Sequence, residues 1–204
     1  MAEQRPFIAF DTETWLIEPG RVAPPPVCLT YDSPALATPQ ILTHKPYIYD
    51  VVRAWLEEPG LVLVAHNAAF DMAVLAVAFP DLLPLVFKAY EDGRIADTAV
   101  WNQLYDIATG QMRDGRKYNL AACVKRRLDL DVEGKTGPDV WRLRYQELDG
   151  VPLRDWPKPA VDYALHDAVY AKLLWSDALR EGIPPDFWPQ MRAAWCLHLM
   201  GMWG

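Results

Sequence analysis

The sequence predicts an α/β protein in which helices cover a mixed β-sheet. Short apolar runs typical of buried strands come first, at residues 7–10, 27–31 and 40–43. Further runs at residues 61–65 and 94–97 alternate with helical patterns, and such alternation favours a layered architecture. The chain has 204 residues, of which 51% are hydrophobic, so one globular domain with a substantial core is expected.

The N-terminal elements are separated by strong turn signals. Residues 7–10 are apolar and lead directly into an acidic segment. The proline- and glycine-containing residues 19–26 interrupt any regular element, so we expect a loop there. The first helix is predicted over residues 50–57, ending at Pro59-Gly60.

The middle of the chain contains the predicted centre of the sheet. Residues 61–65 are a nearly continuous aliphatic run, which is typical of a strand buried on both faces. A helix over residues 68–78 follows and ends before Pro80. The strand at 94–97 leads into a helix at 98–107. Asp97 and Thr98 are the two candidates for its N-cap, and Asp97 is preferred. The remaining predictions are a helix at 119–128, a loop at 129–138, a long helix at 160–180 and a last helix from about 185.

Charge and cysteine content exclude several classes of protein. The net charge of -7 argues against a general DNA-binding surface, which is usually basic. It does not exclude a protein whose carboxylates hold metal ions, because bound cations offset the negative charge of such a site. The three cysteines lie far apart, so we expect neither a zinc site nor a disulfide framework, and a reducing cytoplasm fits. No apolar run is long enough to span a membrane.

Basic residues cluster at 113–117, 125–127 and 142–144. One interpretation is a rim that follows the phosphates of a nucleic acid. The other is a solvated helix face. The sequence does not choose between them.

The segment Phe10-Asp11-Thr12-Glu13-Thr14 follows the first apolar run. On a strand, alternation puts Asp11 and Glu13 on the same face. Two carboxylates so placed repel unless a cation lies between them. A pair of exposed acids at a strand end is the alternative, and the adjoining apolar run makes it less favoured.

Two further acidic segments follow, His66-Asn67-Ala68-Ala69-Phe70-Asp71 and Tyr163-Ala164-Leu165-His166-Asp167. Asp71 lies near a helix start, so its alternative role is a favourable interaction with the positive end of the helix dipole. Phe70 is expected in the core. Tyr163 and Asp167 share one helix face, where packing is the alternative role for the tyrosine. Carboxylate oxygens are the ligands that Mg²⁺ prefers, and two such ions promote phosphodiester cleavage. The chain is therefore predicted to be a metal-dependent nuclease.

In this order the three segments resemble the Exo I, Exo II and Exo III motifs of the DEDD (DnaQ-like) 3′–5′ exonucleases. The form Tyr-x-x-x-Asp marks the DEDDy branch. The DEDDh branch has a histidine five residues before the last aspartate, where this chain has Asp162. The resemblance covers most of the chain from about Phe7 and is strongest with proofreading domains of family A (DNA polymerase I-like) polymerases, especially phage ones. It implies a ribonuclease H-like fold with a five-stranded sheet flanked by helices.

The resemblance also implies the roles of the acidic residues. Asp11 would bridge two divalent cations, Mg²⁺ or Mn²⁺. Glu13 and Asp167 would bind the cation that carries the attacking water, and Asp71 would bind the other. The Tyr163 hydroxyl would orient that water.

Three further positions are implied to bind substrate. Thr14 would hydrogen-bond the terminal nucleotide, and Ile17 would wedge against its base. Asn67 would contact the same nucleotide, with an N-cap role as its alternative.

The leading hypothesis is a proofreading 3′–5′ exonuclease that acts on single-stranded DNA 3′ ends and releases 5′-mononucleotides. An RNA 3′-end trimming exonuclease of the ribonuclease D type uses the same residues and is the nearest alternative. A non-catalytic nucleic-acid-binding module is less favoured because all four acids are present. We expect residues 1–204 to form one exonuclease domain, with an apolar helix at about 185–204 that leads into a polymerase domain. The expected location is the cytoplasm of a bacterial cell or phage-infected host.

Overall fold

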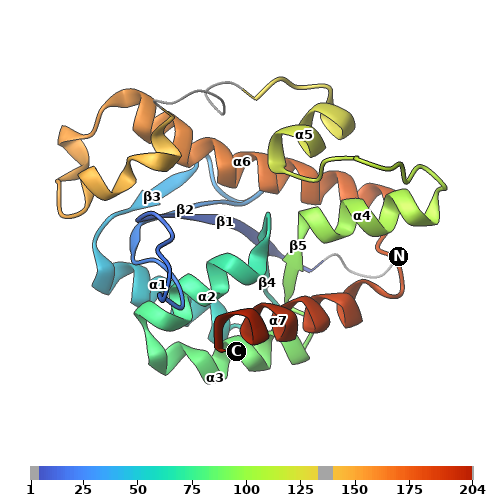
Figure 1. The fold of residues 1–204 in the computed structure, drawn as a ribbon, viewed down its shortest axis with the longest axis horizontal. Helices are drawn as coiled ribbons and strands as arrows, with labels where there is room; N and C mark the ends of the chain where they lie inside the picture. The colour runs from blue at the N-terminus through green and yellow to red at the C-terminus, as the bar shows by residue number, and fades with distance from the viewer. Residues whose placement is uncertain (1–4, 133–139, 204) are drawn as a thin grey trace.

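Strand β1 lies at the centre of a five-stranded mixed sheet with the order β3-β2-β1-β4-β5 (Figure 1). It pairs antiparallel with β2 and parallel with β4, and β4 pairs parallel with β5. The computed structural model describes residues 5–132 and 140–203. The strands are β1 Phe7–Thr14, β2 Pro26–Asp32, β3 Gln40–Leu42, β4 Val62–Ala65 and β5 Ile95–Asp97. The predicted five-stranded sheet flanked by helices is confirmed.

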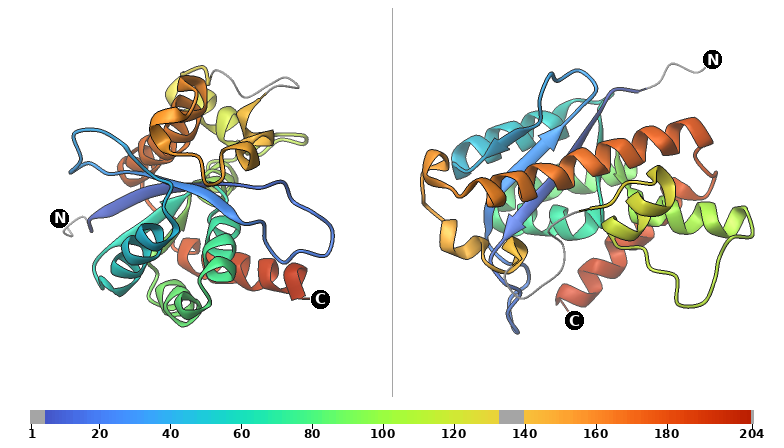
Figure 2. Two further views of the ribbon diagram at one scale, coloured as in Figure 1. Left: turned by 90° about the vertical axis from the view of Figure 1, so that its left-hand side faces the viewer. Right: turned by 90° about the horizontal axis from the view of Figure 1, so that it is seen from above.

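Helices cover both faces of the sheet. The long α6 crosses one face, and α1, α2, α3 and α7 lie on the other (Figures 1 and 2). The helices are α1 Lys45–Glu57, α2 Ala68–Ala78, α3 Leu83–Glu91, α4 Thr98–Ala108, α5 Leu120–Leu128, α6 Lys158–Glu181 and α7 Phe187–Trp203. Short 3-10 turns are η1 Pro80–Leu82, η2 Trp141–Leu143, η3 Tyr145–Leu148 and η4 Leu153–Asp155. None of the helices in the described ranges is long and apolar enough to cross a membrane.

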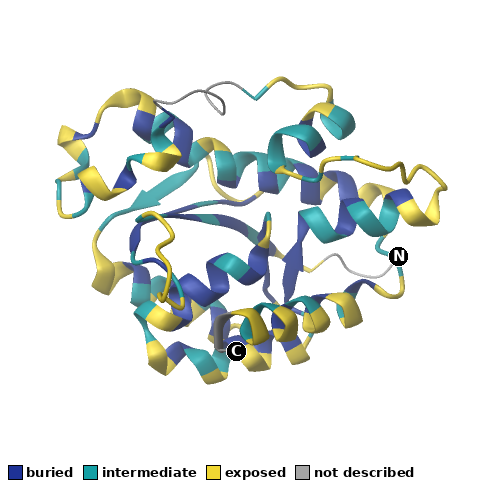
Figure 3. Cartoon of the chain, viewed as in Figure 1, coloured by how far each residue is buried: buried dark blue, intermediate teal, exposed yellow. Residues whose placement is uncertain are grey.

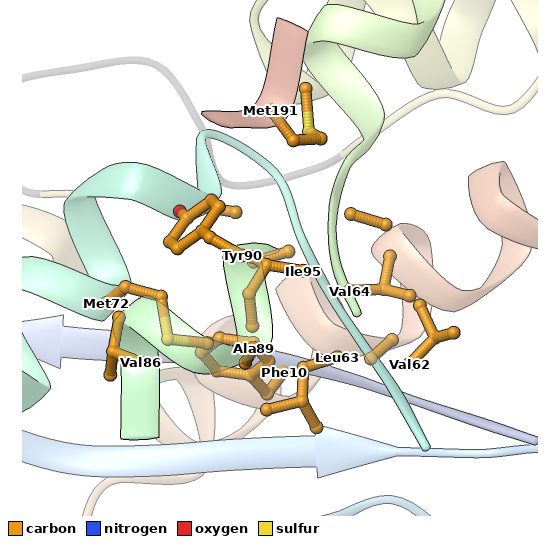
Figure 4. Close-up of a cluster of buried hydrophobic side chains, with 14 of the residues drawn as sticks. Phe10, Val62, Leu63, Val64, Met72, Val86, Ala89, Tyr90, Ile95 and Met191 are labelled. Carbon is orange, nitrogen blue, oxygen red and sulfur yellow. The ribbon is translucent and has the colours of Figure 1, made fainter. Parts of the chain in front are cut away.

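The main core surrounds the sheet: most of its helical side chains come from the helices opposite α6, and α6 contributes Ala171, Trp175 and Ala178. All four residues of β4 are buried, as expected for an interior parallel strand that is covered on both faces. Phe10 of β1 packs among side chains of β4, α2 and α3, including Leu63 and Met72 (Figure 4). Burial is concentrated in the sheet, whereas the outer faces of the helices are exposed (Figure 3).

Several elements differ from the sequence prediction. β1 continues four residues past its apolar run, through the acidic segment to Thr14. α1 begins at Lys45, with Pro46 in its first turn, whereas the prediction began it at residue 50. α3 and the turns η2 to η4 were not predicted. Of the loop expected at 129–138, residues 133–138 lie outside the described residues.

Asp97 joins the sheet to two helices at the carboxyl ends of β4 and β5. Its side chain accepts hydrogen bonds from the amides of Ala99 and Val100 at the start of α4. It also accepts from the amides of Asn67 and Ala68 at the start of α2, both at 3.0 Å. The predicted cap of α4 is therefore confirmed, and the same carboxylate caps α2 as well.

Replacing Asp97 should destabilise the fold strongly. Asp97→Ala leaves four amides of two helix N-termini without their acceptor, so we expect the free energy of unfolding to fall by about 2–4 kcal/mol. Asp97→Asn keeps one acceptor oxygen and should lose less. Urea denaturation measures both, with Asp114→Ala in an exposed loop as the control. Equal stability of Asp97→Ala and the control would contradict this role.

Candidate active site

The acidic side chains of β1 meet α6 on one side of the sheet. One carboxylate oxygen from each of Asp11, Glu13 and Asp167 lies within 4.8 Å of the others. We call these three residues the three-acid cluster. Thr12, between the two acids of β1, contacts α2 on the opposite face, as strand alternation requires. Three oxygen donors at this spacing fit a hard divalent cation, which would relieve their mutual repulsion.

Tyr163 lies one helical turn before Asp167 and lines the same cleft. Burial, and then the negative charges of Asp167 and Glu13, raise the pKa of Tyr163 well above its ordinary value. The hydroxyl therefore keeps its proton at neutral pH. It can donate a hydrogen bond, but it cannot serve as a base.

A small core separate from the main one supports Tyr163. The ring centroid of buried Tyr145 lies 6.1 Å from that of Tyr163. The Tyr145 hydroxyl donates to the carbonyl of Ala160 at 2.8 Å, near the start of α6. The small core consists of Val27, Cys28, Tyr145, Leu148, Trp156, Ala160, Tyr163 and Ala164. The turns between α5 and α6 thus hold the end of α6 that carries the tyrosine.

Asp71, in the first turn of α2, is 2% exposed and also lines the cleft. Its Oδ1 accepts from the amide and the hydroxyl of Thr12, at 3.0 and 2.6 Å. Burial raises the pKa of Asp71 to about 7, although the Thr12 hydrogen bonds oppose the shift. Asp71 is not one of the three-acid cluster, so the structure puts three predicted acids together and the fourth beside them in the same cleft.

The cleft has a volume of about 710 Å³ and reaches from the three-acid cluster to the segment after β1. Thr14 and Ile17, two of the predicted substrate residues, line it. The Thr14 hydroxyl donates to the carbonyl of Trp15 at 2.8 Å. Ile17 is 73% exposed, which is unusual for an isoleucine and leaves its side chain available to a nucleobase.

Asn67, the third predicted substrate residue, is exposed and is not among the residues that line this cleft. It occupies the N-cap position of α2 with φ 72°, a left-handed conformation that asparagine tolerates. Its side chain makes no capping hydrogen bond, because Asp97 fills that role. The alternative of a side-chain N-cap is therefore wrong, and the substrate contact stays a prediction.

Several residues that line the cleft were not predicted from the sequence. Phe70, expected in the core, is only partly buried and lines the cleft instead. Asn119, Arg142 and Leu143 also line it. The helical pattern gave no signal for Phe70, because its neighbours on α2 are almost all apolar. Arg142 was within a basic cluster, but nothing in the sequence singled it out.

Much of the predicted basic rim is structural. Arg116 pairs with buried Asp106, and Arg127 pairs with buried Asp177. Arg126 donates to the carbonyl of Lys117. Arg144 pairs with Glu147 at 2.8 Å. The interpretation of a continuous phosphate-binding rim is not supported for these residues, since other protein groups occupy their guanidinium groups.

Comparison with known proteins identifies a family. A sequence profile of a family described as 3′–5′ exonuclease matches residues 1–181, from before β1 to the end of α6. The three acidic segments all lie within the match. A sequence comparison with curated proteins found no match.

Solved structures share the fold. Brucella melitensis NrnC is 20% identical with a TM-score of 0.64, over 97% of this chain and 87% of that chain. The same protein has been solved bound to pGG and, separately, with bound Mg²⁺. Escherichia coli RNase D, an exoribonuclease involved in structured RNA processing, is 16% identical with a TM-score of 0.62, over 95% of this chain and 45% of that chain. These named neighbours are not polymerase proofreading domains.

The raised pKa of Asp71 predicts a pH-dependent stability in EDTA. Between about pH 4 and 7 the folded protein keeps a proton on Asp71 that the unfolded chain has released, so the free energy of unfolding falls as pH rises through this window. Asp71→Asn should remove this part of the pH dependence. Urea denaturation across the window measures it, with Asp114→Asn as the control. An unchanged pH slope in Asp71→Asn would contradict the shift.

Proposed function

This chain belongs to the 3′–5′ exonuclease family, and from that premise we propose that it removes nucleotides one at a time from RNA 3′ ends. The three-acid cluster carries the proposal for the reaction, because it offers oxygen ligands for a divalent cation on the floor of an open cleft. The choice of RNA rests on the structural neighbours. NrnC has been solved with pGG, and RNase D is an exoribonuclease.

Exonucleases of this family use divalent cations, which supply Lewis acidity to activate water and to stabilise the leaving oxygen. We assign the ligands as the sequence motifs imply. Asp11 would hold both cations, Glu13 and Asp167 the one on the water side, and Asp71 the other. The Thr12 hydrogen bonds fix the carboxylate of Asp71 before any cation binds.

Tyr163 is assigned to orient the attacking water. Its pKa is raised, so the protonated hydroxyl can donate a hydrogen bond but cannot remove a proton. The small core around Tyr145 limits the motion of the ring. Orientation by a held side chain lowers the entropic part of the barrier.

Thr14 and Ile17 are assigned to the terminal nucleotide, because both line the cleft next to the three-acid cluster. Asn67 stays a weaker assignment. We treat residues 1–204 as one exonuclease domain and place it in the cytoplasm, where its free cysteines stay reduced. Proofreading of DNA for a family A polymerase, which the motifs also predict, is the competing proposal.

A direct assay separates the substrates. We expect the chain to shorten 5′-labelled single-stranded RNA from its 3′ end in Mg²⁺ or Mn²⁺, and to be inactive in EDTA. RNA should be cleaved with a higher kcat/KM than DNA of the same sequence. A preference for DNA would favour the proofreading proposal. Cleavage that persists in EDTA, or 5′–3′ polarity, would exclude this mechanism.

Variants at Tyr163 and Asp167 should differ in severity. Tyr163→Phe loses one orienting hydrogen bond, so we expect kcat to fall by about 10- to 100-fold with KM nearly unchanged. Asp167→Ala loses a cation ligand and should leave no measurable cleavage, without loss of fold. Single-turnover cleavage and melting temperatures measured together make the comparison. A wild-type rate for Tyr163→Phe would show that the tyrosine serves packing alone.

A further inference from the structure

Arg142 is the one lysine or arginine among the described residues that line the cleft. The same lining contains four carboxylates, those of Asp11, Glu13, Asp71 and Asp167. His66 also lines it, but its two ring nitrogens contact the Thr98 hydroxyl and the Tyr118 carbonyl. A nucleic-acid strand brings one negative charge for each phosphate. Among the described residues that line this cleft, the guanidinium of Arg142 is the positive charge available to meet it, apart from bound cations.

The side chain of Arg142 is exposed, and no residue in the described part of the chain forms an ion pair with it. Its neighbour Arg144 is different. Arg144 forms two hydrogen bonds with Glu147 and lies over the ring of Trp141, 4.6 Å from its centroid. The two arginines therefore differ: protein groups bind the guanidinium of Arg144, whereas Arg142 lines the cleft.

The turns that follow Arg142 are hydrogen-bonded both to α6 and to the segment after β1. Just after it, Tyr145 is fully buried and donates to the carbonyl of Ala160 at the start of α6. At the end of η3, Asp149 accepts a hydrogen bond from the indole of Trp15 at 3.0 Å, which ties the turn to the segment after β1. Because the backbone of this turn is already held in place, the ordering cost of binding a ligand is mainly the rotamer freedom of the Arg142 side chain itself.

We propose that Arg142 binds a backbone phosphate of the substrate strand on the Tyr163 side of the three-acid cluster. Guanidinium groups bind phosphates through two parallel hydrogen bonds, with charge and geometry both favourable. The positive charge of Arg142 also lowers the pKa of Tyr163 against the larger effect of burial, which agrees with its location near that hydroxyl. This inference rests on the proposed function, since it takes the cleft to receive a nucleic-acid strand.

Binding without turnover tests the proposal. Asp167→Asn would serve as the parent to prevent degradation, with Arg142→Gln, Arg142→Lys and Arg154→Gln added separately. Arg154 is a matched control, because it is an exposed arginine of η4 that does not line the cleft. The probe is a short fluorescein-labelled oligouridylate, and anisotropy in Mg²⁺ at increasing KCl gives the dissociation constant and its salt dependence.

We expect Arg142→Gln to bind about 10-fold more weakly than the parent. The slope of log K against log salt should fall in magnitude by about 0.7, the loss of one phosphate contact to a single strand. Arg142→Lys should keep the slope with intermediate affinity, and Arg154→Gln should match the parent. Equal effects of Arg142→Gln and Arg154→Gln would overturn the inference, as would a parent that binds no strand. The cleavage assay on the wild type decides separately whether the chain is a nuclease.

Discussion

The carboxylate of Asp97 joins the starts of α2 and α4 at the carboxyl ends of β4 and β5, next to the candidate site. By accepting amides at the starts of α2 and α4, it fixes where α2 leaves β4. α2 then carries Asp71 to the hydroxyl and amide of Thr12. This contact joins α2 to β1 at Thr12, which lies between Asp11 and Glu13 of the three-acid cluster. The position of the cluster thus depends on a chain of hydrogen bonds that begins two strands away.

Several carboxylates in this region are buried, although burial disfavours their charged form. Asp71, Glu13 and Asp97 are all buried polar groups in a chain with a net charge of -7. Asp71 lines the same cleft as Glu13, and the charge of Asp97 helps to raise the pKa of Asp71. Asp97 is satisfied by amide donors, and Asp71 by Thr12. The three-acid cluster accumulates negative charge in a way that cations can relieve. Clustering these carboxylates lowers the stability of the fold, whereas cation binding for activity requires it, as is common where a site needs concentrated charge.

The elements that one strong local signal defines were predicted well from the sequence. The bounds of α2 were predicted at 68–78, because a strand, a polar turn and Pro80 define them. Strand alternation placed Asp11 and Glu13 on one face, and the family resemblance added Asp71 and Asp167. The structure brings Asp11, Glu13 and Asp167 within 4.8 Å of one another, with Asp71 in the same cleft. α3 was not predicted because two prolines close together, Pro80 and Pro84, are typical of a loop. Pro84 instead lies in the first turn of the helix, where proline is tolerated. The basic clusters could not be resolved, since Arg116 and Arg127 differ from Arg142 only in tertiary contacts with Asp106 and Asp177.

Because the interior is divided into two cores, the site can lose its order without unfolding of the whole domain. Tyr163 rests on the small core formed by residues of β2, the turns after α5 and the start of α6, whereas most of the sheet rests on the main core. Local opening of the small core would release the tyrosine while the sheet stayed folded, because regions of a protein open with different free energies. Thermal stability of the whole chain is thus a poor guide to how well ordered the reacting end of α6 is. Stabilising the main core would raise the melting temperature without making that end more rigid.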